Sequence, residues 1–197
     1  MKTQVTLRLS GHLSSKPFDK VLRKLPPLEG RAVAIRLLPD LSAGSRKLYS
    51  RRAYGQPVFA ASFIRKREIV LDRELADKPN ELARILTHEL FHFVWVRLGN
   101  PTRRSFGDLL RREFERRARG ELGWSAESRK LRLAANPHLS ARGRRRWGDY
   151  TCESFCDTAA WLYSGVHRHK EFTLGKRERT RRAEWFGRTF AQCVVSI

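Results

Sequence analysis

The sequence predicts an α+β fold in which a strand-rich half comes first and a helical half follows. Apolar residues alternate in the first 75 residues and recur at helical spacing after them. The chain has 197 residues, of which 41% are hydrophobic and 31% charged, as in a globular protein with one core. We therefore expect one domain over residues 1–197. Its strand-rich half is residues 1–75, a small and mostly antiparallel sheet, and its helical half is residues 76–197.

Strands are predicted where β-branched and other apolar residues alternate or run between turn residues, over residues 4–10, 32–38, 47–54, 58–64 and 68–71. The last two segments flank Arg65-Lys66-Arg67 and predict an antiparallel hairpin. Residues 42–55 otherwise have the composition of a polar connection. A short helix is predicted over residues 16–25, because Pro26 and Pro27 stop it.

Helices are predicted over residues 80–98, 106–118, 127–135, 148–163 and 176–195. The first starts near the capping residues Asp77 and Asn80 and is stopped by Gly99-Asn100-Pro101. The second has an apolar stripe with arginines on its outer face. Residues 142–146, with four arginines, are predicted to form a basic loop before the fourth helix.

The charge of the chain is strongly positive. There are 41 Lys and Arg residues against 20 Asp and Glu, so the net charge is +21, and 31 of the basic residues are Arg. Residues 103–146 hold 14 basic and 5 acidic residues. This predicts nonspecific association with a polyanion or nucleic acid, against the simpler interpretation of a solvated Arg-rich surface. No apolar run is long enough for a membrane span, and the three cysteines do not form a disulfide framework, so we expect a cytoplasmic protein.

A HExxH motif lies inside the helix predicted over residues 80–98. His88 and His92 are one turn apart, so two imidazoles face the same way and can bind one Zn²⁺. Glu89 lies beside them and can act as a base on water at the metal. Leaving these polar residues unpaired in an apolar helix would cost free energy, which favours a metal site over a chance pair of histidines.

A zinc site of this kind needs a third protein ligand. Glu153 and Asp157 lie on one face of the helix predicted over residues 148–163, in a stretch where acidic residues are scarce, so Glu153 is the candidate. The alternatives are His138, His167 and His169. A purely solvated acidic face is the interpretation without a metal.

The segment from Ile85 to Val94 resembles the extended HExxH pattern of the zincin metallopeptidases. Glu153 followed by Asp157 is similar to the second motif of the glutamate-type zincins (gluzincins) and of the CAAX-protease and anti-repressor peptidases. The resemblance covers only these two helices, about 35 residues. It implies a zincin-like fold, in which His88, His92 and Glu153 bind zinc and Asp157 accepts a hydrogen bond from His88.

The resemblance also implies hydrolysis of a peptide or protein substrate, with Glu89 as general base and an extended peptide pairing with the 58–71 hairpin. Zincins often stabilise the oxyanion with a His or Tyr, for which Tyr150, His167 and His169 are the candidates. A third His ligand would instead resemble the SprT-like proteases that act on DNA-bound proteins. The remaining alternative is a basic nucleic-acid-binding protein without enzymatic activity.

Overall fold

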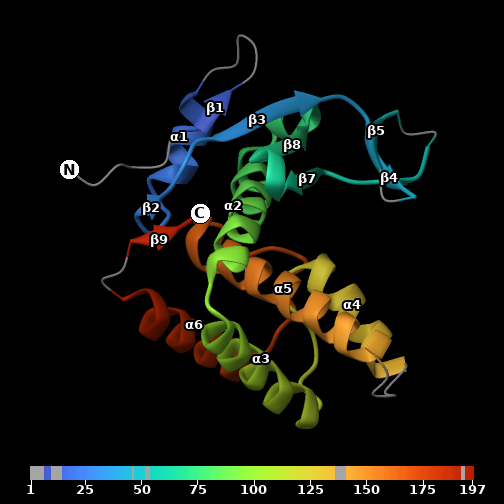
Figure 1. Cartoon of the computed structure of the whole chain (residues 1–197), viewed down its shortest axis with the longest axis vertical. Helices are drawn as coiled ribbons and strands as arrows, with labels where there is room; N and C mark the ends of the chain where they lie inside the picture. The colour runs from blue at the N-terminus through green and yellow to red at the C-terminus, as the bar shows by residue number, and fades with distance from the viewer. Residues whose placement is uncertain (1–6, 10–14, 46, 52–53, 136–140, 192–193) are drawn as a thin grey trace.

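Four strands form the main sheet, in the order β1 (Leu7–Leu9), β3 (Val33–Leu38), β8 (Glu68–Asp72) and β7 (Ala60–Phe63). The computed structural model describes residues 7–9, 15–45, 47–51, 54–135, 141–191 and 194–197, with only the backbone for 141 and 142. Val33, Ile35, Ile69 and Leu71 are fully buried. The two central strands β3 and β8 therefore supply the sheet side of the core (Figure 1).

The sheet is mostly parallel, so the prediction of a mostly antiparallel sheet was wrong. β1 pairs parallel with β3, and β3 with β8; only β7 and β8 are antiparallel. The first parallel pair is possible because α1 (Lys16–Leu22) lies in the crossover between its strands. The predicted 58–71 hairpin is confirmed, with the 3₁₀ turn η1 (Ile64–Lys66) between its strands.

The connection from β3 to β8 contains a second, antiparallel sheet that the sequence predicted only in part. Its order is β5 (Lys47–Ser50), β4 (Leu41–Gly44), β6 (Gln56–Pro57). The polar composition of this segment hid β4, whose Ser42 is buried and bonded through its hydroxyl to the carbonyl of Arg51.

Five helices follow the 3₁₀ turn η2 (Arg73–Asp77): α2 (Pro79–Arg97), α3 (Asn100–Glu115), α4 (Trp124–Ala135), α5 (Ala141–Tyr163) and α6 (Lys176–Phe190). α2 begins at a proline, whose missing N–H would have no helical partner there. Residues 82–91 of α2 are all buried. Figure 1 shows α2 running from the sheet to the other helices, where it packs against α5.

Two of the predicted helix boundaries were wrong. α5 begins at Ala141, so residues 142–146 are helical and do not form a loop. α6 ends at Phe190, and β9 (Val195–Ser196) pairs parallel with β2 (Leu28–Glu29). The apolar period at residues 190–195 came from a strand end buried in the core, where Val195 and Ile197 are 3% and 1% exposed.

Aromatic side chains fill the space between the helices. Phe155 of α5 stacks on Phe186 of α6, with ring centroids 5.0 Å apart, and contacts Phe91 of α2 at 5.9 Å. These residues belong to the same hydrophobic cluster as the β3 and β8 side chains. The cluster fixes α5 against α2, and these two helices carry the predicted site.

A candidate metal centre

α2 presents its two histidines on one face, as the spacing predicted. The Nε2 atoms of His88 and His92 are 3.1 Å apart, and the two ring centroids are 4.9 Å apart in an edge-on arrangement. His88 and Glu89 are 9% and 8% exposed, so the polar residues of the motif are buried with the apolar ones around them.

α5 brings Glu153 to these histidines. Its Oε2 lies 3.3 Å from Nε2 of His88 and 3.9 Å from Nε2 of His92. Sixty residues separate His92 from Glu153, and the packing of α2 on α5 places the three donor atoms together. The other carboxylate oxygen, Oε1, accepts a charged contact at 2.8 Å from Arg129 of α4, a residue that the sequence did not single out.

Asp157 is the partner of His88, as the resemblance implied. Its Oδ1 lies 2.7 Å from Nδ1 of His88, and its Oδ2 accepts the N–H of Ala126 at 3.0 Å. The side chain is buried by close approach of Gly123, where an added Cβ would lie 2.3 Å from the carboxylate. Because Asp157 accepts a hydrogen bond from Nδ1, it directs the lone pair of His88 Nε2 toward Glu153.

The donor set fits Zn²⁺. Two imidazole nitrogens and one carboxylate oxygen are ligands typical of a catalytic zinc site. Tetrahedral coordination at ordinary Zn–N and Zn–O lengths separates neighbouring donor atoms by about 3.3 Å. The observed separations of 3.1, 3.3 and 3.9 Å bracket that value.

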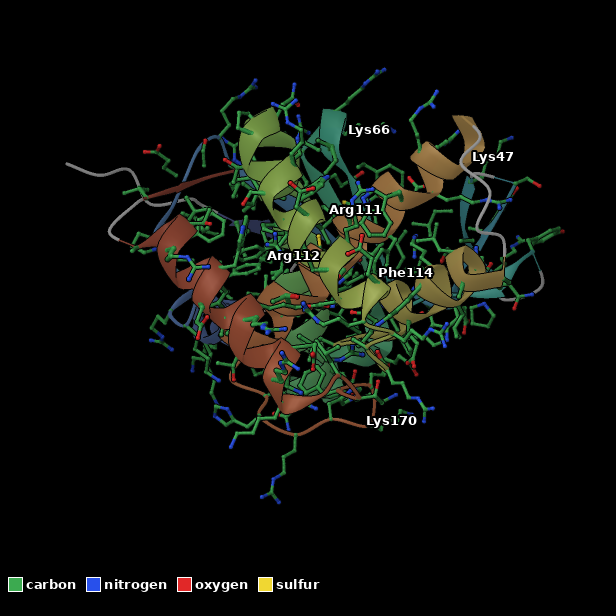
Figure 2. The ribbon with its side chains drawn as sticks, turned by 90° about the horizontal axis from the view of Figure 1, so that it is seen from below. Lys47, Lys66, Arg111, Arg112, Phe114 and Lys170 are labelled. Atoms are coloured by element: carbon green, nitrogen blue, oxygen red, sulfur yellow. The ribbon has the colours of Figure 1, made fainter. Side chains whose placement is uncertain are left out.

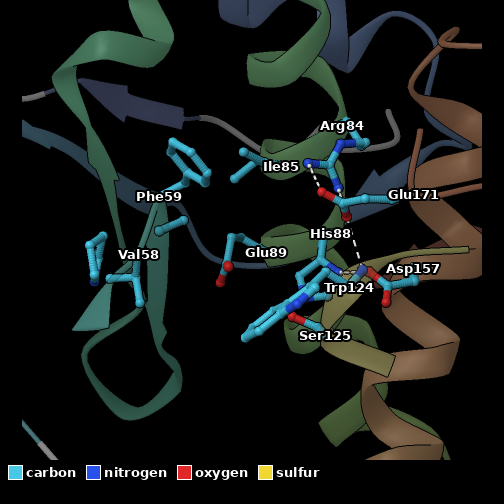
Figure 3. Close-up of a pocket in the computed structure, with 12 residues that line it drawn as sticks. Val58, Phe59, Arg84, Ile85, His88, Glu89, Trp124, Ser125, Asp157 and Glu171 are labelled. Carbon is cyan, nitrogen blue, oxygen red and sulfur yellow. Dashed lines mark hydrogen bonds and ion pairs between the residues drawn. The ribbon is translucent and has the colours of Figure 1, made fainter. Parts of the chain in front are cut away.

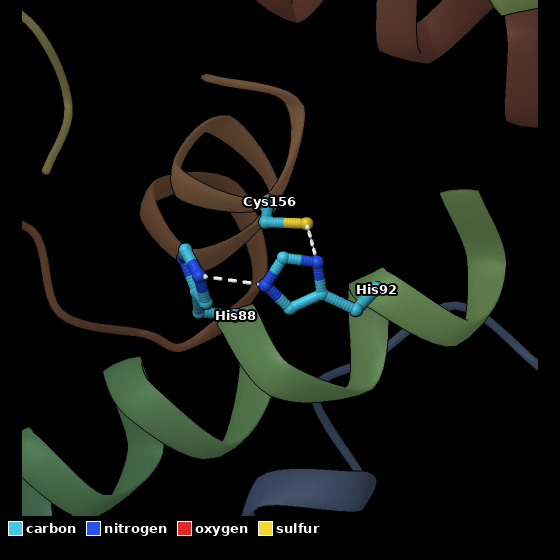
Figure 4. A group of neighbouring side chains, drawn as sticks. All are labelled: His88, His92 and Cys156. Atoms are coloured by element: carbon cyan, nitrogen blue, oxygen red, sulfur yellow. Dashed lines mark hydrogen bonds between the residues drawn. The ribbon is translucent and has the colours of Figure 1, made fainter. Parts of the chain in front are cut away.

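Cys156 forms a second potential donor group with the same histidines, its ligand atoms lying within 4.8 Å of theirs (Figure 4). Its Sγ is 3.5 Å from Nδ1 of His92, on the ring nitrogen away from Glu153. Burial raises the pKa of the Cys156 thiol well above its usual value, and a protonated thiol is a poor metal ligand. We therefore favour Glu153 as the third ligand.

Both buried thiols of α5 contact His92. Cys152 Sγ also lies 3.5 Å from its Nδ1. The hydrogen bond from Cys156 lowers the pKa of Cys152 to about 6, with a further contribution from His92. The sequence suggested only packing for these cysteines. In the structure they occupy the position in which a histidine ligand ordinarily meets a carboxylate or a carbonyl.

The carboxylates and histidines of the site shift each other's pKa. Burial alone would raise the pKa of Glu153, but the hydrogen bond from His88 and the positive charges around it lower it to about 2. Burial alone would lower the pKa of His88, but Asp157 and Glu153 raise it well above its usual value. These are two sides of one interaction. A metal must displace the proton of His88, so its binding weakens as the pH falls.

Glu89 faces an open cavity of about 320 Å³ between β7 and α2 (Figure 3). The hydroxyl of Ser62 on β7 lies 2.5 Å from Oε2 of Glu89 and 3.1 Å from its carbonyl oxygen. The cavity wall includes the exposed side chains of Phe59 and Trp124, which are 49% and 65% exposed. The general base predicted from the sequence is thus beside the donor atoms and open to a substrate.

A polar cluster closes one end of this cavity. Arg84 donates to Glu171 at 3.0 Å and to Glu81 at 2.8 Å, and the backbone N–H of Trp124 donates to Glu171 at 2.9 Å. The sequence gave no signal for this cluster, because its members come from α2 and from the segment after α5.

The three candidates for an oxyanion donor lie apart from the donor atoms. The hydroxyl of Tyr150, fully buried, donates to Glu121 at 2.6 Å. His169 Nε2 contacts Glu81 at 2.6 Å, and its Nδ1 accepts the N–H of Glu171 at 3.2 Å. His167 is exposed. His138, the other alternative ligand, lies outside the described residues.

Among the described residues, no helix is both long and apolar enough to cross a membrane. No protein-family model, no curated protein and no solved structure matches this chain.

Proposed function

We propose that this protein is a zinc-dependent metallopeptidase of the gluzincin type. The observation that carries the proposal is the convergence of two histidine Nε2 atoms and one Glu153 oxygen beside a buried glutamate that faces an open cavity. A structural zinc site would be closed by four protein ligands and would need no such base.

His88, His92 and Glu153 would hold the metal, and Asp157 orients the ring of His88. Zinc in such a site supplies Lewis-acid activation of water and of the scissile carbonyl. Ser62 holds Oε2 of Glu89, so we assign proton transfer to Oε1. That oxygen takes a proton from the attacking water and delivers it to the departing amine.

The proposed substrate is a peptide or an extended segment of a protein. β7 lies at the end of the sheet order, and its preceding residues Pro57, Val58 and Phe59 line the cavity. An extended peptide adding to this edge would pass beside Glu89. Phe59 and Trp124 offer apolar surface to its side chains.

The third ligand separates this proposal from the SprT-like alternative. The structure favours Glu153, because His169 is engaged with Glu81 and His167 is exposed. Glu153→Ala is expected to lose the zinc and His167→Ala to retain it, as measured by metal content after dialysis. The opposite result would favour a three-histidine site.

The catalytic test is Glu89→Gln, with fluorescein-labelled casein as substrate. The variant removes the base and keeps the shape, so turnover should fall by about 10²- to 10⁴-fold while zinc content stays at about one per chain. Glu184→Gln, on the exposed side of α6, is the matched control and should be fully active. Undiminished turnover in Glu89→Gln would assign the activity to another site or to a contaminant.

A further inference from the structure

A second cavity, of about 370 Å³, lies between α3 and α5. Two indoles and three guanidinium groups take part in its lining, together with one carboxylate: Trp95, Trp147, Arg103, Arg104, Arg111 and Asp108. Its residues on α5 occupy turns of the helix nearly opposite to Glu153 and Asp157. The cavity is therefore separate from the candidate metal centre.

The aromatic part of this groove is held in place. The guanidinium of Arg111 lies over the ring of Trp147, 5.3 Å from its centroid. Phe114 and Tyr150 contact the same indole edge-on, with centroids 6.2 and 5.5 Å away. Figure 2 shows Arg111 and Phe114 on α3, which faces the viewer there. A guanidinium stacked on a fixed indole is a platform on which a further flat, unsaturated ring can stack.

The surface around the groove is more basic than the sequence count suggests. Of the five acidic residues in 103–146, Glu113 and Glu121 are fully buried and bonded to Arg182. Asp108 is the one carboxylate among the groove's lining residues. Exposed arginines continue from the groove along α3 and the first turns of α5: Arg112, Arg144, Arg145 and Arg146.

We propose that this groove binds single-stranded nucleic acid. A base would stack on the Arg111–Trp147 pair, and the flanking phosphates would contact Arg103, Arg104 and the arginines of α5. The charge selects an anionic chain, and the aromatic floor selects one with unstacked bases, which a duplex does not offer. The inference goes beyond the proposed peptidase function and does not depend on it.

The sharpest test is at Gly148, which lines the groove and whose added Cβ would have no atom within 4 Å. Gly148→Glu places a carboxylate in the groove, and Gly148→Gln is its matched neutral control. Binding of fluorescein-labelled oligo-dT and oligo-U of about 12 nucleotides is measured by anisotropy at about 50 mM salt. We expect Gly148→Glu to weaken binding at least about 10-fold and Gly148→Gln to stay within about 2-fold of the parent.

The contribution of the arginines is tested by the salt dependence. Replacing Arg103, Arg104 and Arg111 together by Gln should reduce the slope of log K against log salt by about 2, at about 0.7 per lost phosphate contact on a single strand. The control replaces three exposed arginines outside the groove, Arg73, Arg177 and Arg188, with the same loss of charge. It should leave most of the affinity intact.

The stacking contribution is tested at Trp147. Trp147→Leu should weaken binding about 5-fold or more and Trp147→Phe should restore most of it, with Trp124→Leu, an exposed indole outside the groove, as the control. Circular dichroism melting shows that each variant is folded. Equal effects of Gly148→Glu and Gly148→Gln would overturn the proposal. So would a duplex bound as tightly as the single strand, or phosphatidylserine vesicles bound more tightly than the oligonucleotides. Zinc content and casein hydrolysis of Gly148→Glu should equal those of the parent.

Discussion

Arg182→Met is expected to destabilise the protein strongly, because Arg182 is the centre of a buried ionic network. Its guanidinium is fully buried and donates to Glu113 at 2.6 Å and to Glu121 at 2.8 Å, both of which are also fully buried. The same guanidinium donates to the hydroxyls of Ser154 and Thr158 on α5 at 2.9 and 3.4 Å. The network therefore ties α6 and α3 to the helix that carries Glu153.

The magnitude follows from the burial. Removing one partner of a buried ion pair costs about 3–5 kcal/mol, because the remaining charges stay buried without compensation. Here two carboxylates would be left, with Lys130, 3.2 Å from Glu121, as the remaining nearby cation of the network. For 197 residues the entropy of unfolding is about 0.4 kcal/mol per degree, so the melting temperature should fall by about 7–12 °C.

The assay is thermal unfolding followed by circular dichroism, with Arg188→Met as the matched control. Arg188 lies on the exposed side of the same helix, so its replacement should change stability by less than about 0.5 kcal/mol. A fall of less than about 2 °C for Arg182→Met would refute the reasoning, because it would mean that the two carboxylates are solvated or protonated at little cost.

Further predictions concern the candidate metal centre. Asp157→Asn should weaken zinc binding by about 10- to 100-fold in a chelator competition, and unchanged affinity would remove Asp157 from the site. Gly123→Ala should have a similar effect, because its Cβ would displace the Asp157 carboxylate, whereas Gly187→Ala, with open space around it, should bind zinc normally. In the metal-free protein the lowered pKa of Glu153 stabilises the fold above about pH 4.5, and this contribution is lost as the pH falls toward about 2. The raised pKa of His88 contributes stability below about pH 6.5 that is lost as the pH rises through that raised pKa. Acid titrations of the parent and of Glu153→Gln should therefore differ between pH about 4.5 and 2, and coincident curves would contradict this.

The strands and helices were largely predictable because their signals are local. The alternation of Val33 and Ile35 and the helical spacing of the HExxH segment depend only on neighbours in the chain, and the structure has a strand and a helix there. The direction of strand pairing was not predictable. A hairpin such as that of β7 and β8 is visible in a turn, but the parallel pairing of β3 with β8 depends on a long excursion between them.

The candidate site divides in the same way. The sequence alone determined which side chains have the chemistry of a zinc peptidase, because His88, Glu89 and His92 are one helical turn apart and Glu153 and Asp157 share another. Only the tertiary structure decided what these residues meet. The packing of α2 on α5 brings Glu153 to the histidines, and it sets Cys152 and Cys156 against His92. It also turns Tyr150 inward to Glu121 and gathers arginines and indoles between α3 and α5. The physical reason is that contacts between distant segments follow from how whole helix faces pack, which no local spacing records.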